Sequence, residues 1–242
     1  MVFVKGAGAR YTCGMKKRPI AIFDIDGTIF RSSLLIELNA LLVKHGIFPQ
    51  AAHEEVAQVR EAWLDRKGSY VDYINTIVGL YGRDIRNAHV SDVRRISRLM
   101  INEQKHRVYV FTRELIKKLR KTHTLIVISY SPSEVVEAFN HFYHFDIVSG
   151  LSYPNARGRY TGTVHVGEAP DKKATLTGLI AKHNLSLKNS IGIGDSESDI
   201  AFLELVRHPI AFNPNKKLYA HARRKKWEVV VERKDVIYTA FK

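Results

Sequence analysis

The sequence has little of several features that define whole classes of protein. Cys13 is the only cysteine in 242 residues, which excludes an internal disulfide framework and is typical of a reducing compartment. No apolar run approaches the roughly 18 residues that a membrane-spanning helix needs. Residues 1–14 lack the apolar stretch of a secretory signal, and we expect them to form a loose tail. We therefore predict a cytoplasmic protein with no membrane partner.

Acidic side chains are scarce relative to basic ones. The chain has 38 Lys and Arg against 24 Asp and Glu, a net charge of +14. Such an excess can attract nucleic acid. The densest basic stretch, residues 216–226, contains no acid. It has no motif of a nucleic-acid-binding fold and no interleaved aromatic ladder, so we expect a solvated helix there and regard nucleic acid as an unlikely partner.

Hydrophobic residues make up 45% of the chain and recur in short runs. The runs are residues 20–25, 124–129, 145–150, 189–195, 208–212 and 227–231. Most are rich in Ile and Val, as buried parallel strands are. Amphipathic helical stretches separate most of them, and this alternation predicts an α/β fold with a mainly parallel sheet. Residues 158–164 alternate after a turn-like segment and predict part of a hairpin instead.

One long section interrupts the alternation of strand and helix. Residues 32–46, 51–68, 69–82 and 91–104 each repeat the helical period, with no strand between them. We therefore expect a helical lobe over residues 32–107, inserted between two parts of an α/β core, residues 15–31 and 108–242.

Chemically reactive side chains stand at predicted strand ends or helix starts in four places. They are Asp24 with Asp26, Ser129, Lys172, and Asp195 with Asp199. Open α/β sheets bind ligands at the carboxyl ends of their strands, so these side chains could meet at one site.

Each of these motifs also has a simpler interpretation. Asp24–Thr28 could be a turn or a calcium loop, but an EF-hand needs a preceding helix and a glutamate at the twelfth loop position, which this segment lacks. The stretch "GIGDSESD" approaches a dinucleotide-binding fingerprint, but Glu197 occupies the third glycine position. Ser129 alone could cap a helix, and Lys172 alone could be a surface lysine. Their order and placement together favour a catalytic site.

The four motifs together resemble those of the haloacid dehalogenase superfamily of phosphohydrolases. Asp24–Thr28 matches its D-x-D-G-T motif, and Gly194–Asp199 matches its G-D-x-x-x-D motif. Ser129 and Lys172 match the second and third motifs, and spacing favours Lys172 over Lys173. The helical insertion resembles the cap of the phosphoserine-phosphatase-like subgroup, subfamily IB. The resemblance implies a three-layer, Rossmann-like core with an inserted helical cap.

The resemblance also implies a role for each site residue. Asp24 would attack phosphorus and form an aspartyl-phosphate, while Asp26 would serve as general acid and then general base. Mg²⁺ would be held by Asp24, Asp195 and the backbone carbonyl of Asp26. Asp199 would orient Lys172 or a metal-bound water. The phosphate and substrate would be bound by Thr28, Ser129, Tyr130 and Lys172.

We therefore predict a phosphoric monoester hydrolase that uses Mg²⁺ and acts on a small phosphorylated metabolite. A phosphotransferase or phosphomutase of the same family is one alternative, and a basic nucleic-acid-binding protein is another. Phosphoserine is not favoured, because Tyr130 and Ser131 replace the glycines usual after the second-motif serine in phosphoserine phosphatases. Cap-side residues that could face the substrate are Arg31, Glu37, Arg60 and Tyr73.

Overall fold

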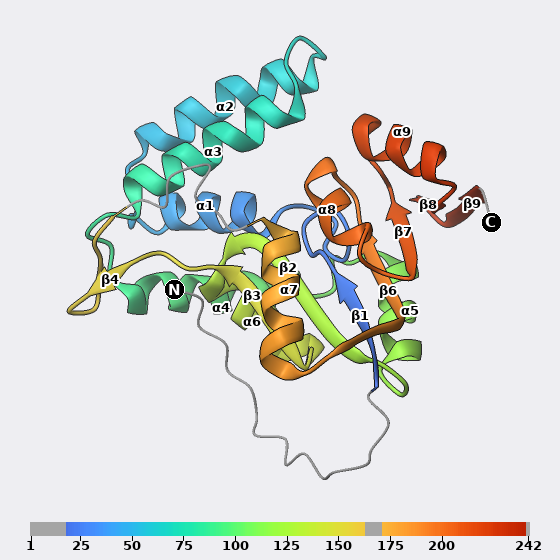
Figure 1. The fold of residues 1–242 in the computed structure, drawn as a ribbon. Helices are drawn as coiled ribbons and strands as arrows, with labels where there is room; N and C mark the ends of the chain where they lie inside the picture. Colours follow the sequence, from blue (N-terminus) through green and yellow to red (C-terminus); the bar gives the residue numbers. More distant parts are fainter. Residues whose placement is uncertain (1–17, 163–170, 241–242) are drawn as a thin grey trace.

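A seven-stranded sheet forms the centre of the computed structural model, which describes residues 18–162 and 171–240 (Figure 1). Its strand order is β3-β2-β1-β6-β7-β8-β9, and every neighbouring pair is parallel except β8 and β9. The strands are β1 (Pro19–Phe23), β2 (Thr124–Pro132), β3 (Ile147–Leu151), β6 (Ser186–Gly194), β7 (His208–Phe212), β8 (Glu228–Arg233) and β9 (Val236–Ala240). This confirms the predicted α/β fold with a mainly parallel sheet.

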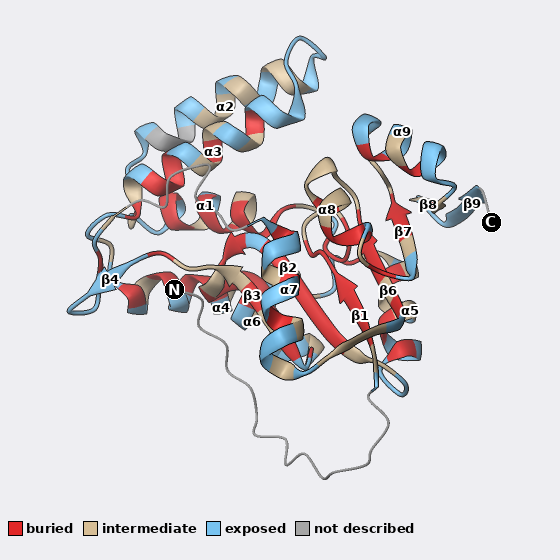
Figure 2. Cartoon of the chain, in the orientation of Figure 1, coloured by how far each residue is buried: buried red, intermediate tan, exposed pale blue. Residues whose placement is uncertain are grey.

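Helices cover both faces of this sheet. They are α5 (Val110–Leu119), α6 (Ser133–Tyr143), α7 (Lys172–His183), the 3₁₀ turn η1 (Glu197–Asp199), α8 (Ile200–Leu203) and α9 (Lys216–Lys225). Successive strand side chains point to opposite faces. In β1, Ala21 and Phe23 pack with residues of α5 and α6, whereas Ile20 and Ile22 pack with residues of α7, α8 and α9. The sheet is thus the middle of three layers, and its central strands are the most buried part (Figure 2).

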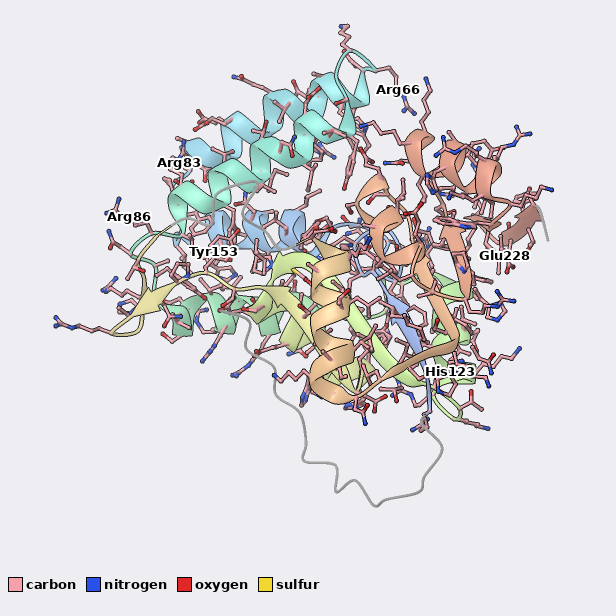
Figure 3. The ribbon with its side chains drawn as sticks, viewed as in Figure 1. Arg66, Arg83, Arg86, His123, Tyr153 and Glu228 are labelled. Atoms are coloured by element: carbon pink, nitrogen blue, oxygen red, sulfur yellow. The ribbon has the colours of Figure 1, made fainter. Side chains whose placement is uncertain are left out.

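The section that interrupts the alternation forms helices between β1 and β2. They are α1 (Leu34–Lys44), α2 (Ala51–Leu64), α3 (Tyr70–Asp84) and α4 (Val90–Gln104). Helices α2 and α3 form a hairpin that extends beyond the sheet, with Arg66 in the loop at its tip and Arg83 at the opposite end of α3 (Figures 1 and 3). Buried residues of α1, α3 and α4 join the hydrophobic cluster that contains Phe23. The insertion therefore packs directly against the core.

A small antiparallel hairpin, β4 (Asn155–Ala156) with β5 (Arg159–Tyr160), lies beside the start of α4. It confirms the hairpin predicted there, as far as residue 162. The tail predicted for residues 1–14 falls outside the described residues. Within residues 18–162 and 171–240, no helix has the length and apolar character to cross a bilayer.

The sequence patterns do not predict β9. This strand pairs antiparallel with β8 at the margin of the sheet, and all its residues are exposed. Its five residues are apolar, aromatic or β-branched, but they do not alternate with polar ones, because neither face of β9 is buried.

Candidate active site

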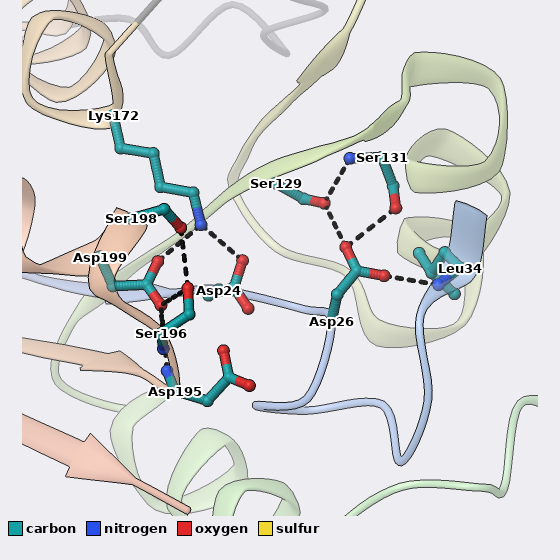
Figure 4. Close-up of polar contacts among 10 residues, drawn as sticks. All are labelled: Asp24, Asp26, Leu34, Ser129, Ser131, Lys172, Asp195, Ser196, Ser198 and Asp199. Carbon is teal, nitrogen blue, oxygen red and sulfur yellow. Dashed lines mark hydrogen bonds and ion pairs between the residues drawn. The ribbon is translucent and has the colours of Figure 1, made fainter. Parts of the chain in front are cut away.

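The carboxyl ends of three central strands carry predicted polar residues. Asp24 directly follows β1, Ser129 lies near the end of β2, and Asp195 directly follows β6. Strands β2 and β6 are the two neighbours of β1, and the register pairs Phe23 with Ile193. The pairing continues one residue further, since the Asp24 N–H donates to the carbonyl of Ile193 at 3.0 Å. Parallel pairing therefore brings three distant segments together (Figure 4).

Lys172, the first residue of α7, forms two buried ion pairs. Its Nζ lies 2.7 Å from Asp24 Oδ1 and 2.6 Å from Asp199 Oδ1. No side chain in this trio is more than 5% exposed. Burial opposes the charge on the ammonium, but the two carboxylates outweigh burial and raise the pKa of Lys172. The neighbouring Lys173 is exposed, so the structure joins Lys172 to the acids.

The cluster contains three carboxyl groups, those of Asp24, Asp195 and Asp199, and one lysine. Burial raises the pKa of Asp24 to about 7, while Lys172 acts in the opposite direction. Burial also raises the pKa of Asp195 well above its ordinary value, and repulsion from Asp24 and Asp199 adds to the rise. A second cation beside these carboxyl groups would favour their ionised forms.

The oxygen atoms of the cluster suit a divalent cation. Asp24, Asp195 and Asp199 each offer an oxygen, and these oxygens lie within 4.8 Å of one another. Asp199 is already committed, because Oδ1 accepts from Lys172 and Oδ2 accepts from the N–H groups of Asp195 and Ser196 at 3.0 Å. No hydrogen bond among the described residues uses the Asp195 carboxylate or Asp24 Oδ2. Such carboxylate oxygens are the ligands that Mg²⁺ prefers.

Two glycines allow these acids to approach the backbone. Gly27 has a φ of +77°, and a Cβ there would lie 2.1 Å from Asp195 Oδ2. A Cβ on Gly194 would lie 2.5 Å from the Asp199 side chain. The glycines of the first and last motifs therefore leave space for the carboxylates themselves.

Asp26 belongs to a second polar group beside this cluster. Its Oδ2 accepts hydrogen bonds from Ser129 Oγ at 2.8 Å and from Ser131 Oγ at 2.9 Å, and its Oδ1 accepts one from the Leu34 N–H. Ser131 was not among the predicted site residues. Its spacing of two from Ser129 places both side chains on the same face of β2, a signal that could have identified it.

The remaining predicted site residues differ in their surroundings. Thr28 is fully buried, and no hydrogen-bond partner for its Oγ1 exists among the described residues. Its side chain is therefore not directed at solvent beside the acids. Tyr130 is 37% exposed, and Lys172 Nζ lies 5.1 Å from the centre of its ring. Tyr130 thus contacts the cluster through its aromatic face.

The cap-side candidates are mostly engaged in other contacts. Tyr73 is 4% exposed and stacks on Trp63 with ring centres 5.6 Å apart. Arg60 is exposed. Arg31 lies over the Tyr109 ring at 5.6 Å. The remaining candidate, Glu37, contacts three other side chains and is considered below.

Two tyrosines that the sequence did not single out lie near the acids. Tyr70 is 45% exposed; partial burial raises the pKa of its phenol, and the charges of Asp26, Asp195 and Asp24 add to the rise. Burial also raises the pKa of Tyr109, on which Asp195 acts in the same direction. The proximity of Tyr70 could not be predicted, because it depends on how the α2–α3 hairpin is oriented.

Known proteins resemble this chain over most of its length. At 24% identity, 221 residues match the "Inhibition of morphological differentiation protein" of Streptomyces azureus, covering 88% of this chain and 78% of that protein. At 23% identity, 223 residues match a histidinol-phosphatase of Neisseria meningitidis serogroup C (strain 8013), covering 87% and 97%.

Solved structures share the fold. A protein of unknown function from Bordetella pertussis Tohama I superposes with a TM-score of 0.68 at 18% identity, over 88% of this chain and 98% of that chain. A phospho-aspartyl intermediate analogue of phosphoserine phosphatase superposes with a TM-score of 0.57 at 18% identity, over 91% and 96%.

A family model gives the assignment. The model of haloacid dehalogenase-like hydrolases matches residues 21–204, a range that contains all four motifs. The chain therefore belongs to the haloacid dehalogenase-like hydrolases, which confirms the family that the motifs predict.

Proposed function

We propose that this hydrolase is a magnesium-dependent phosphomonoesterase that transfers the phosphoryl group of a small ester to Asp24. One observation carries the proposal: the buried trio of Asp24, Lys172 and Asp199 lies beside the Asp195 carboxylate, which has no hydrogen bond among the described residues. A carboxylate beside fixed positive charge can act as a nucleophile towards an anionic phosphate.

In the first step, an Asp24 oxygen bonds to phosphorus and the bond from phosphorus to the alcohol oxygen breaks. Protonated Asp26 gives its proton to the departing alcohol. In the second step, a water gives a proton to Asp26 and bonds to phosphorus. The bond between phosphorus and Asp24 then breaks and inorganic phosphate leaves. Lys172 would neutralise phosphoryl charge in both steps, and Ser129 would bind a phosphoryl oxygen.

Mg²⁺ would be held by Asp24, Asp195 and the backbone carbonyl of Asp26. When bound, it supplies neutralisation of phosphoryl charge and polarisation of the phosphoryl oxygens. Asp199 would hold Lys172 and the N–H groups of Asp195 and Ser196 in place. The fit of the donor set supports this assignment.

Replacing Gly27 with alanine tests the metal site. The added Cβ would displace Asp195, and we expect the Mg²⁺ concentration for half-maximal activity to rise by about tenfold or more, as when ligand supports are lost. Activity measured against Mg²⁺ concentration gives this value. Gly46→Ala is the matched control, because Gly46 has a φ of +70° and open space at its Cβ. An unchanged Mg²⁺ requirement in Gly27→Ala would contradict the Asp195 assignment.

We further propose that residues 32–107 act as a cap over the core, residues 15–31 and 108–242. The Leu34 N–H on Asp26 and the proximity of Tyr70 to the acids support this division. A helical cap close to the acids would exclude water and large substrates. Such a cap would favour a small-molecule ester as the substrate.

The ester we propose carries a flat ring. Tyr70, Tyr109 and Tyr130 come from three separate segments. Lys172 Nζ lies 5.1 Å from the centre of the Tyr130 ring, while burial raises the pKa of Tyr70 and of Tyr109 and acids of the cluster add to the rise. The face of a tyrosine ring can stack on a planar group of a ligand. The names of similar proteins supply two test substrates, histidinol phosphate and phosphoserine, and the tyrosines favour histidinol phosphate.

A panel of phosphate esters tests this function. We expect histidinol phosphate to be hydrolysed with a kcat/KM about fivefold or more above that of phosphoserine, which is the scale of one aromatic contact. Release of inorganic phosphate measures the rates, and chelation of the divalent cation should abolish activity on every ester. Activity that survives chelation would refute the metal assignment. Preference for phosphoserine would refute the ring-bearing substrate alone.

The alternatives predict other products and partners. A phosphotransferase or mutase would pass the phosphoryl group to a second alcohol, so ¹⁸O-labelled water would enter little of the phosphate released. For nucleic acid, the basic side chains of α9 are partly committed within the chain, with Lys217 at 3.1 Å from Glu197 and Lys225 at 3.7 Å from Glu204. We therefore keep a small molecule as the proposed partner. A cytoplasmic location stays a prediction.

A further inference from the structure

The chain enters and leaves the helical insertion through two paired segments. The Arg31 N–H donates to the carbonyl of Arg107 at 2.9 Å, and the Tyr109 N–H donates to the carbonyl of Ile29 at 3.0 Å. Phe30 and Val108 form an antiparallel bridge between these bonds. Any movement of the helices relative to the sheet must therefore pass through this pair of segments, which we call the hinge (residues 29–32 and 106–109).

Glu37 joins both sides of the hinge. Its Oε1 accepts hydrogen bonds from Ser32 Oγ and Arg107 Nη1, each at 2.7 Å, and its Oε2 accepts one from Gln104 Nε2 at 3.1 Å. Arg107 also donates to Gln104 Oε1 at 3.1 Å. The Glu37 side chain is only 20% exposed, so these charge-assisted bonds are partly shielded from water. We call this group the Glu37 clamp (Ser32, Glu37, Gln104 and Arg107).

The same helix that carries Glu37 also touches Asp26. Leu34 is the first residue of α1, and its N–H donates to Asp26 Oδ1. The first N–H groups of a helix have no partner within the helix, so the Leu34 N–H is available to the Asp26 side chain. The first turn of α1 therefore binds Asp26 through the N–H of its first residue, Leu34, and carries Glu37 three residues further along the helix. The other Asp26 oxygen is held by Ser129 and Ser131 of the core.

We infer that the Glu37 clamp positions Asp26 for proton transfer by fixing the first turn of α1 across the hinge. Glu37 is a positioning residue in this account, and it does not touch the substrate, because three donors already occupy both of its oxygens. This inference rests on the proposed function, in which Asp26 gives a proton to the leaving alcohol. It differs from the expectation that Glu37 could face the substrate.

Leaving-group dependence tests this role directly. An alkyl alcohol needs a proton to leave, whereas p-nitrophenolate leaves without one, and kcat/KM reports the transfer to Asp24. We expect Glu37→Gln to lower kcat/KM for the best alkyl ester of the panel by about tenfold, a part of what general acid catalysis contributes. For p-nitrophenyl phosphate the change should stay within about twofold, because no proton transfer contributes there.

Matched variants separate positioning from simple loss of structure. Arg107→Gln removes the other charged partner and should give the same selective loss, and the double variant should lose no more than either single one. Glu55→Gln breaks a cap ion pair with Arg83 at 3.0 Å, remote from the hinge, and should leave both rates unchanged (Figure 3). Thermal unfolding of each variant confirms that it is folded.

The outcomes distinguish the inference from the function it rests on. Equal losses for both esters, or no loss for either, would overturn the role of Glu37 while the phosphatase function stands. If the wild-type protein hydrolyses neither ester, the proposed function itself fails. A selective loss in both single variants supports the clamp.

Discussion

Replacing Asp24 with asparagine should reduce phosphate release by about 10⁴-fold or more, the scale on which enzymes lose rate when a covalent nucleophile is removed. Asparagine has nearly the same shape and keeps an oxygen that can accept from Lys172. Burial already raises the pKa of Asp24, so a neutral side chain of equal size is compatible with its surroundings. The fold should persist while the reaction is lost.

Two measurements check this expectation. Steady-state phosphate release gives the rate, and acid quenching with a ³²P-labelled substrate should trap labelled protein in the wild type and none in Asp24→Asn. Asp171→Asn is a suitable control, since Asp171 caps α7 through a bond from the Lys173 N–H and asparagine caps helices equally well. Substantial turnover by Asp24→Asn would overturn the assignment of the nucleophile.

Replacing Lys172 with alanine should affect both activity and stability. The loss leaves Asp24 and Asp199 buried without their common cation, and breaking a buried pair in this way costs about 3–5 kcal/mol of unfolding free energy. We also expect kcat/KM to fall by about 10³-fold, because a fixed charge at the phosphoryl group is removed. Urea denaturation and phosphate release measure the two effects.

Lys173→Ala gives the matched control for this prediction. Lys173 is the next residue of α7 and is exposed, so its removal should change the unfolding free energy and the rate only slightly. Lys172→Met keeps the aliphatic stem and separates loss of charge from loss of packing. The interpretation of the third motif is wrong if Lys173→Ala abolishes turnover and Lys172→Ala does not.

Most of the fold could be predicted because its elements have strong local patterns. The Ile- and Val-rich runs became buried strands of the central sheet, and the four helical stretches of the insertion became α1–α4. The order of the strands could not be derived in the same way. Placing β1 between β2 and β6 depends on pairing between segments far apart in the chain, which no local period encodes.

The same distinction between local pattern and tertiary contact applies to the candidate site. Asp24, Lys172, Asp195 and Asp199 could be selected because each has a characteristic neighbour in the sequence and stands at a strand end or helix start. Ser131 could be chosen only through its spacing of two from Ser129, and Tyr70 had no comparable signal in the sequence. Ser131 matters through its bond to Asp26, and Tyr70 matters through the orientation of the α2–α3 hairpin. Thr28 belongs to the first motif, yet its side chain is fully buried and its Oγ1 has no hydrogen-bond partner among the described residues.

The sequence by itself determined which segments are strands and helices and which reactive side chains stand at their ends, because periodicity and motif spacing act over a few residues. The tertiary structure decided which of those side chains meet. The bonds of Lys172 to Asp24, of Ser129 to Asp26 and of Arg107 to Glu37 span 148, 103 and 70 residues. Contacts at such separations exist only once sheet pairing and cap packing have brought their segments together.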